Sequence, residues 1–411
     1  MSFFEKIHQI DFFQIMPCRK SGLESVLKGH DLTSVDLISY DDSCYAGVRE
    51  ILSPSGLADN VGSFYFIPKL VQLTGVDLEV AVQLVYSGFV FIAFLSAVIA
   101  IWFYFQSLAG KIIGTIALAM VSLLTAAIGD YYVFAAALPM AIIPWLIQIL
   151  KNPINNINYL YLYFFLVGIL ISVGHLIRSH SGTDVIIFIL IGFVFFAKFY
   201  SYKQKTILIL ILTLSMVSIF TWFNSIVDKR VEYLTSIDSN YELSSERIKW
   251  HNIYYSLGYL QNSFSKVKGY DRHEPNDSYS KDRALQINPE VKLWSSDYED
   301  ILRAETFRFI SDHKSFFIKS ILVKIGVMFL YIALFMNIGI VMIYYYKTNI
   351  DFHLLFLSGI GFNMIFGVIT SPDYRYLTGL FLFSVLYSIY IIDSVIFNGF
   401  VKNNNVKKLI R

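Results

Sequence analysis

Nine long apolar runs divide this chain, and they restrict its possible folds more than any other feature. They lie near residues 83–106, 111–128, 131–150, 157–176, 185–197, 205–224, 320–346, 352–370 and 376–397. Most reach the roughly 17–25 residues that a helix needs to cross the hydrocarbon core of a bilayer. Only 16% of the residues are charged, against roughly 25% in a typical soluble domain. The sequence therefore predicts an all-α, polytopic membrane protein with about nine transmembrane helices.

Two of these runs have special features. The run from Val185 to Ala197 is short and needs flanking residues to complete a span. Gly129–Asp130 leaves almost no loop between the second and third runs, which indicates a hairpin of two helices.

The runs also divide the chain into five predicted regions. These are a first-loop region with juxtamembrane helices (1–82), six spans (83–224), a soluble helical loop domain (225–315), three spans (316–397) and a basic tail (398–411).

Lysine and arginine mark every second connection between the runs. One set of connections holds ten basic residues: Lys111, Lys151, Lys198, Lys203, Lys205, Lys347, Lys402, Lys407, Lys408 and Arg411. The short loops between them hold only Arg178 and Arg375. Because cytoplasmic loops are enriched in basic residues, the first set is predicted to be cytoplasmic. The first-loop region, Asp130 and the loops 178–184, 225–315 and 371–375 then face the other side.

This orientation has a consequence for the beginning of the chain. No segment within residues 1–80 is apolar enough to span a membrane, so the first-loop region would start outside the cytoplasm. Either the chain inserts with its N-terminus out, or an initial transmembrane helix precedes the sequence given. We favour the second explanation, a truncated or mis-started chain.

The strongest local pattern is the stretch YDDSCYAGVREIL at residues 40–52. Asp41 and Asp42 lie at the predicted start of a short helix, where carboxylates favour the positive end of the helix dipole. An apolar stripe follows at helical spacing, so the helix is expected to lie flat on the membrane. A carboxylate held there can act as a general base or bind a divalent cation. The alternative is helix capping in a solvated acidic turn.

The pattern Asp41-Asp42-x-x-Tyr45-x-x-x-Arg49-Glu50 resembles the first external loop of GT-C glycosyltransferases. The resemblance is closest to lipid A aminoarabinose transferases and protein O-mannosyltransferases. It implies that Asp41 or Asp42 is the catalytic base, that Tyr45 binds substrate and that Asp42 can hold a divalent metal ion. Family members begin with a transmembrane helix before this loop, and this chain shows none.

The resemblance also implies the partners. The donor would be a sugar on polyprenyl phosphate, and the acceptor an envelope glycan, lipid or protein on the non-cytoplasmic face of a bacterial inner membrane. A single displacement needs only one base, so inversion at the anomeric carbon is expected. No basic stripe indicates nucleic acid binding.

Two further outer connections carry candidate site residues. In the superfamily, a second acidic residue near the donor phosphate or metal often occupies the position of Asp130; the alternative is a polar residue that marks a hairpin. Arg178 is predicted to bind the donor phosphate through paired hydrogen bonds, with His180 nearby for substrate. A snorkelling arginine is the alternative for Arg178.

The last outer loop and the helix after the long loop add more candidates. Asp373 and Tyr374 suit sugar recognition, and Arg375 suits the donor phosphate; the alternative is an interfacial tyrosine belt with a local ion pair. Lys324 lies about one turn inside its predicted span. It either binds lipid phosphate or snorkels to the surface.

The long loop combines aromatic and acidic residues in a way that is typical of carbohydrate binding, although an ordinary helical domain explains them equally well. Trp250, His251 and Tyr298 belong to this set. Ser296-x-x-Glu299 resembles a capping box that opens a helix through about Asp312, with Glu299 placed to pair with Arg303.

Two other functions compete with a glycosyltransferase. An O-antigen polymerase or ligase also carries a large outer loop with arginines but usually lacks the acidic pair. A polytopic transporter or flippase would place ionisable groups near the bilayer midplane. The sequence favours the glycosyltransferase because the predicted spans are nearly free of charge in their middles.

Overall fold

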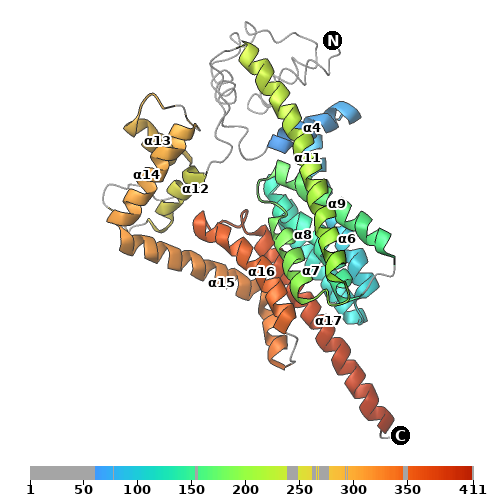
Figure 1. Cartoon of the computed structure of the whole chain (residues 1–411). Helices are drawn as coiled ribbons and strands as arrows, with labels where there is room; N and C mark the ends of the chain where they lie inside the picture. Colours follow the sequence, from blue (N-terminus) through green and yellow to red (C-terminus); the bar gives the residue numbers. More distant parts are fainter. Residues whose placement is uncertain are drawn as a thin grey trace. The chain divides into compact units, whose positions relative to one another are not determined.

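The computed structural model describes residues 61–76, 78–152, 156–237, 249–261, 265, 267, 277–291, 293, 295–345 and 350–409. Every regular element in this part of the chain is a helix, which confirms the predicted all-α class (Figure 1). Asp41, Asp42 and Tyr45 lie outside the described residues.

The helices follow one another in a simple order. They are α4 (Val61–Thr74), α5 (Leu78–Gln83), η3 (Leu84–Gly88), α6 (Phe89–Tyr104), α7 (Leu108–Ala126), η4 (Tyr131–Val133), α8 (Phe134–Lys151), α9 (Ile157–Ile177), α10 (Thr183–Phe195), α11 (Tyr202–Ile237), α12 (Lys249–Ser256), η5 (Leu257–Leu260), α13 (Asp277–Ile287), α14 (Ser296–Asp312), α15 (Lys314–Tyr345), α16 (Ile350–Ile369) and α17 (Thr378–Leu409).

Eight helical stretches are long and apolar enough to cross a membrane, as expected for a multi-pass membrane protein. They are Val80–Tyr104, Leu108–Ala126, Tyr131–Lys151, Ile157–Ile177, Tyr202–Asp228, Lys314–Ile343, Phe352–Ile369 and Thr378–Phe397. The ninth predicted run is the shorter apolar helix α10. Each apolar run in the sequence thus corresponds to one helical stretch.

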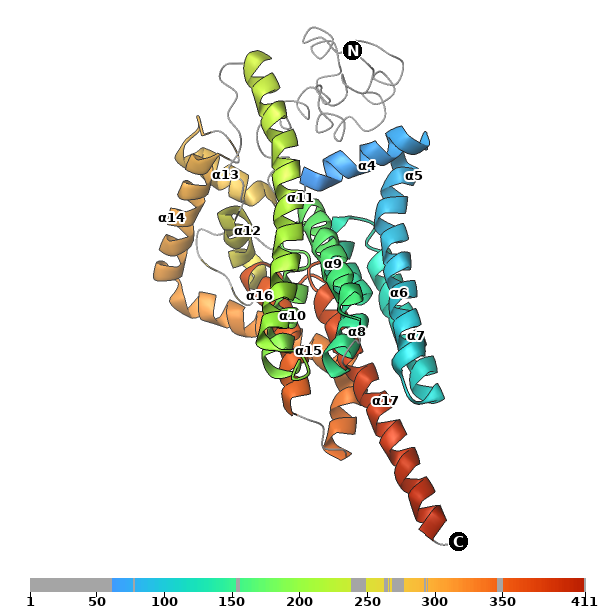
Figure 2. The ribbon, with the colours of Figure 1, turned by 45° about the vertical axis from the view of Figure 1, so that its right-hand side comes forward.

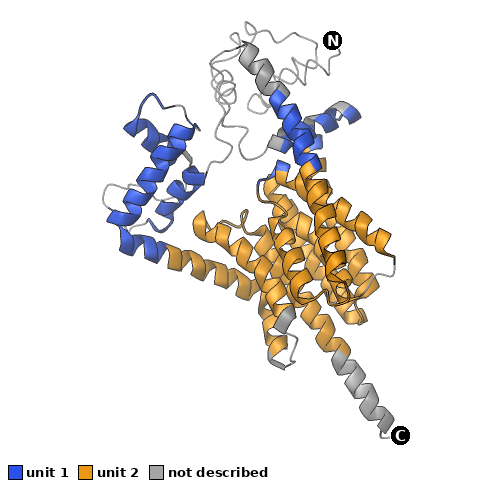
Figure 3. Ribbon diagram, viewed as in Figure 1, with its two compact units in different colours: residues 1–81, 176–179, 218–320 blue, residues 82–175, 180–217, 321–411 orange. Residues whose placement is uncertain are grey.

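The chain forms two compact units (Figure 3). Unit 1 comprises residues 1–81, 176–179 and 218–320, and unit 2 comprises residues 82–175, 180–217 and 321–411. Unit 2 contains most of the apolar helices, and unit 1 contains most of the polar ones.

Helices α8 and α17 form the interior of unit 2. The membrane-length segments of α8 and α17 are 78% and 83% buried, against 33% for those of α6 and α7. Helix α8 packs against α6, α10 and α17, while α17 also packs against α7 and α16. Figures 1 and 2 show this bundle from two sides.

Helix α8 carries two internal prolines, Pro139 and Pro144. Each proline lacks an N–H, so it leaves the carbonyl four residues earlier without its usual partner within the helix. Tyrosine hydroxyls from neighbouring helices bind other carbonyls of α8: Tyr163 donates to Ile142 O (3.0 Å) and Tyr390 donates to Pro144 O (3.2 Å). These cross-helix bonds fix α8 within the bundle.

Asp393 of α17 holds the beginning of α7. Its carboxylate accepts hydrogen bonds from Gln106 N (3.2 Å), Ser107 N (3.0 Å) and Ser107 Oγ (2.7 Å). Ser107 in turn caps α7 by accepting from Gly110 N (2.9 Å). Asp393 is only 8% exposed, so its three donors replace the water that a buried carboxylate would otherwise need.

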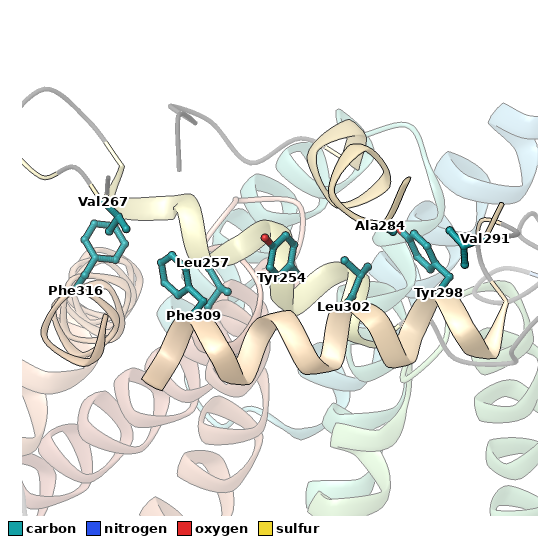
Figure 4. Close-up of a cluster of buried hydrophobic side chains, with 9 residues drawn as sticks. All are labelled: Tyr254, Leu257, Val267, Ala284, Val291, Tyr298, Leu302, Phe309 and Phe316. Atoms are coloured by element: carbon teal, nitrogen blue, oxygen red, sulfur yellow. The ribbon is translucent and has the colours of Figure 1, made fainter. Parts of the chain in front are cut away.

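Within unit 1, α12, α13, α14 and the start of α15 enclose a hydrophobic core (Figure 4). Tyr298, Leu302 and Phe309 lie along one side of α14, four and seven residues apart, and therefore share one helix face. They pack with Tyr254 and Leu257. The long polar segment thus contains a helical domain with its own core.

The predicted helix from Ser296 to about Asp312 is present as α14, but two details of the prediction are wrong. The N-cap is Ser295, whose Oγ accepts from Tyr298 N (3.2 Å), rather than Ser296. Glu299 does not pair with Arg303, which instead lies 3.8 Å from Asp300. Glu299 is buried and turned toward α12 instead.

Glu299 caps α12 from a distant part of the chain. Its carboxylate accepts from Trp250 N (2.7 Å) and His251 N (3.2 Å), at the start of that helix. Burial raises the pKa of the Glu299 carboxyl above its ordinary value, although the backbone N–H donors oppose this shift.

Substitution of Glu299 by alanine is expected to destabilise the protein by about 1–3 kcal/mol, because one buried and one partly buried N–H group lose their acceptor. Asp300→Ala is the matched control, since its side chain is 72% exposed on the same helix. The thermal unfolding midpoint of each purified variant measures the effect. Equal midpoints for the two variants would contradict the capping role.

Candidate functional site

The predicted site residues fall into three groups. Asp130, His180, Lys324, Asp373, Tyr374 and Arg375 all belong to unit 2. Arg178 belongs to unit 1, directly after the end of α9. Asp41, Asp42 and Tyr45 lie outside the described residues, so the site can be built only from the unit 2 group.

Asp130 forms a tight turn between α7 and α8. Gly129 adopts a positive φ of 68°, which glycine does without steric cost. Asp130 is then the N-cap of η4, and its carboxylate accepts from Tyr132 N (2.8 Å). The predicted hairpin is therefore present, and Asp130 has a local structural role in it.

The Asp130 turn meets the last outer loop. The rings of Tyr132 and Tyr376 lie edge to face with centroids 4.8 Å apart, and Tyr131 lies against Tyr132 at 4.7 Å. Thr378 Oγ1 donates to Tyr132 O (3.3 Å). Two connections more than 240 positions apart in the chain thus share one end of unit 2, opposite to Lys111 and Lys151.

Asp373 and Arg375 form an ion pair beside these tyrosines. The Arg375 guanidinium donates to both carboxylate oxygens of Asp373, through Nε at 3.2 Å and Nη2 at 3.0 Å. Burial alone would raise the pKa of Asp373, but the hydrogen bonds and charge of Arg375 outweigh it and hold that pKa below its usual value. The side chain of Arg375 is 46% exposed, so an anion from solvent can reach it.

The low pKa of Asp373 predicts a small effect on stability. Near neutral pH, the free energy of unfolding of the wild type is expected to exceed that of Asp373→Asn by less than about 1 kcal/mol, because the ion pair is partly exposed. This advantage is present above the ordinary aspartate pKa of about 3.9 and is lost as pH falls through the lower folded value. Unfolding midpoints of both proteins from pH 7 to pH 3 test it. A difference between the two midpoints that stays constant from pH 7 to pH 3 would contradict the prediction.

Lys324 is predicted to bind lipid phosphate or to snorkel to the surface, but the structure places it in neither position. It is 2% exposed, and its ammonium group donates to Thr370 O and Val368 O (3.3 Å) at the C-terminal end of α16. A cation there satisfies carbonyls that the helix leaves without partners and faces the negative end of its dipole. These contacts give Lys324 a structural role just before the 371–376 loop.

His180 lies in a strained turn between α9 and α10. Its φ of 72° is rare for a residue other than glycine. Its backbone N–H donates to His175 Nδ1 (3.3 Å), and its ring lies 5.5 Å from that of Phe366 in α16. Strain of this kind concentrates at functional sites, which keeps His180 among the candidates.

A buried polar pair lies beneath these loops. Asp184 of α10 and Asn363 of α16 are 3% and 4% exposed, and Asn363 Nδ2 donates to Asp184 Oδ2 (3.1 Å). Asp184 lies at the end of the predicted outer loop 178–184, whereas Asn363 is not among the residues identified from the sequence. The available signal was a lone amide within the apolar run 352–370, since polar residues in spans often bond between helices.

The carbohydrate-binding interpretation of several long-loop residues is not supported, because they belong to the core. His251 and Tyr298 are buried, and His251 Nδ1 lies 2.6 Å from the Tyr298 hydroxyl. Among the described residues, no group of three or more His, Cys, Asp and Glu is arranged to hold a metal ion. The proposed metal residue Asp42 is outside those residues, so a site shared with Asp130 stays a prediction.

Comparisons of the chain with protein-family models, with curated proteins and with solved structures found no match.

Proposed function

We propose that this chain is a membrane glycosyltransferase of the GT-C type. It would transfer a sugar from a polyprenyl-phosphate donor to an envelope glycan, lipid or protein on the non-cytoplasmic face of a bacterial inner membrane, with inversion. Asp41 or Asp42 would deprotonate the acceptor, or Asp42 would hold a divalent metal ion with Asp130.

One observation carries the proposal beyond the sequence pattern. The turn at Asp130 and the loop at Asp373–Arg375 lie together at the end of unit 2 that has few lysines. Aromatic rings beside a carboxylate and a guanidinium suit a ligand that combines a sugar with a phosphate. Within this site Arg375 would bind the donor phosphate, and Asp130, Asp373 and Tyr374 would contact the sugar.

The other proposed donor contacts have less support. Arg178 is assigned to the donor phosphate only because of its position in the sequence. His180 and Tyr45 would contact substrate. Lys324 would act on the phosphate at a distance, because its ammonium group is bound to carbonyls of α16.

The direct test is transfer of a radiolabelled sugar from polyprenyl phosphate by the purified protein in lipid nanodiscs. Labelled product should accumulate with the wild type and fall with Arg375→Ala. Addition of a chelator decides whether a metal is needed. Absence of transfer from a panel of polyprenyl-phosphate sugars to envelope acceptors would reject the proposal.

A transporter or flippase remains the second candidate, because ionisable residues are buried among the helices of unit 2, Asp184 and Lys324 among them. Asp184 is 3% exposed and Lys324 is 2% exposed. Such residues often line substrate paths in transporters. Uptake of labelled substrates or flipping of labelled lipid by reconstituted vesicles, with no covalent product, would favour this candidate over an enzyme. An O-antigen polymerase or ligase is distinguished by its tolerance of Asp42→Ala.

A further inference from the structure

The buried pair Asp184–Asn363 joins two helices of unit 2, each of which carries a candidate loop. Asp184 Oδ2 accepts from Asn363 Nδ2 (3.1 Å), and Asp184 Oδ1 accepts from Val185 N (2.8 Å). Asn363 Nδ2 also donates to Gly359 O (2.9 Å) within α16. The pair therefore connects the start of α10, which follows the His180 turn, with the helix that leads into the 371–376 loop.

The same amide reaches the first turn of α17. A Cβ added to Gly379 would collide with Asn363 Oδ1 and would lie 2.9 Å from Ala135 O of α8. Only glycine allows the helices to approach this closely. The preceding residue, Thr378, donates to Tyr132 O (3.3 Å). Asn363 is thus the point at which α10, α16 and α17 contact one another, next to the Asp130 turn.

The energetic reason for such an arrangement is the cost of burying polar groups. A carboxyl or amide in an apolar bundle is costly unless its hydrogen bonds are made. A shift of α16 against α10 would separate Asp184 from Asn363 and leave both groups without this bond. The pair therefore opposes sliding of these helices more strongly than apolar contacts of the same area, which can repack.

We propose that Asp184 and Asn363 form a positioning clamp that fixes the 371–376 loop against the Asp130 turn. Neither residue contacts the sugar or the phosphate in this proposal. The rings of Tyr132 and Tyr376 mark the contact between the two loops that the clamp holds together. Its consequence for catalysis rests on the function proposed above, whereas its consequence for the loops does not.

The loop contact can be measured by cross-linking. Cys18 and Cys44 are replaced by serine, and the Tyr132→Cys and Tyr376→Cys substitutions introduce a reactive pair. A short bifunctional thiol reagent then reports how often the two loops are in contact. The yield is measured only in the monodisperse fraction from size-exclusion chromatography, so unfolded protein does not contribute.

In this background, Asn363→Asp is expected to lower the cross-linking yield at least threefold, because two carboxyl groups then face each other. Gly379→Ala is expected to lower it as well, because the added methyl group displaces the amide. The exchanged pair, Asp184→Asn with Asn363→Asp, should restore at least half of the yield. Recovery is incomplete because an ionised carboxylate at position 363 cannot donate to Gly359 O.

Ser172→Ala is the control. Ser172 is fully buried and its hydroxyl donates to Gly168 O of its own helix, so its loss should leave the yield unchanged. An unchanged yield in Asn363→Asp, or no recovery in the exchanged pair, would overturn the clamp.

Sugar transfer is measured in parallel in chains that keep Tyr132 and Tyr376. Asn363→Asp is expected to reduce kcat at least tenfold, with a smaller change in KM for the donor, and the exchanged pair to recover part of it. If the cross-linking changes as expected but even the wild type transfers no sugar, the clamp stands and the proposed function fails. If the wild type transfers sugar and Asn363→Asp keeps both its activity and its cross-linking, the clamp alone fails.

Discussion

Substitution of Asp393 by alanine is expected to lower the stability of the folded protein by about 3 kcal/mol, because three partly buried donors at the start of α7 lose their buried acceptor together. Two of these donors are backbone N–H groups of Gln106 and Ser107, which no side-chain rearrangement can redirect. The third is the Ser107 hydroxyl, which also caps α7. Loss of Asp393 therefore weakens both the start of α7 and its packing against α17.

The unfolding midpoint of the purified protein, followed by fluorescence-detected size-exclusion chromatography, measures this effect. Ser384→Ala in the same helix is the matched control, because Ser384 is fully buried and its hydroxyl donates to Leu380 O within α17 rather than to another helix. Asp393→Asn should fall between the two, since it keeps one carbonyl oxygen as an acceptor. Midpoints of Asp393→Ala and Ser384→Ala that agree would exclude the cross-helix role.

The largest effect on activity is expected from the first-loop acids. Asp42→Ala or Asp41→Ala should reduce the rate of sugar transfer by about 10²–10⁴-fold, the usual contribution of a general base. A metal ligand in the same position would give a loss that added divalent cations partly reverse. Initial rates with saturating donor and acceptor measure the change.

Asp36→Ala is the matched control for this experiment, because Asp36 is an acidic residue of the same region outside the first-loop pattern. It should keep the wild-type rate. Full activity in both Asp41→Ala and Asp42→Ala would remove the GT-C assignment and favour the O-antigen polymerase or ligase. A loss in Asp36→Ala equal to that in Asp42→Ala would indicate general damage to the region.

The helices of this chain could be predicted because the thickness of a bilayer sets the length of a transmembrane helix. Apolar runs of that length are visible in the sequence. The runs 83–106 and 352–370 correspond to the stretches Val80–Tyr104 and Phe352–Ile369, with boundaries that differ by at most three residues. The short run at 185–197 is matched by the shorter helix α10. The hairpin turn at Gly129–Asp130 could also be predicted from the local sequence.

Contacts between distant residues were not predictable from the same pattern. Glu299 was expected to pair one turn along its own helix, yet it caps α12 about 50 positions earlier in the chain. Asn363 meets Asp184 across 179 positions. Lys324 was expected to meet lipid phosphate or water, but the end of α16 supplies carbonyl groups instead. In each case tertiary packing selected a partner that local spacing does not contain.

The prolines of α8 have a consequence for how this bundle can bend. Pro139 cannot donate to Ala135 O, and that oxygen lies where α17 begins, beside Gly379. A break in the hydrogen-bond ladder at this depth makes the first turn of α8 a hinge, which can tilt without unwinding the remainder of the helix. Any rocking of the Asp130 turn would then be confined to the few residues that precede Pro139.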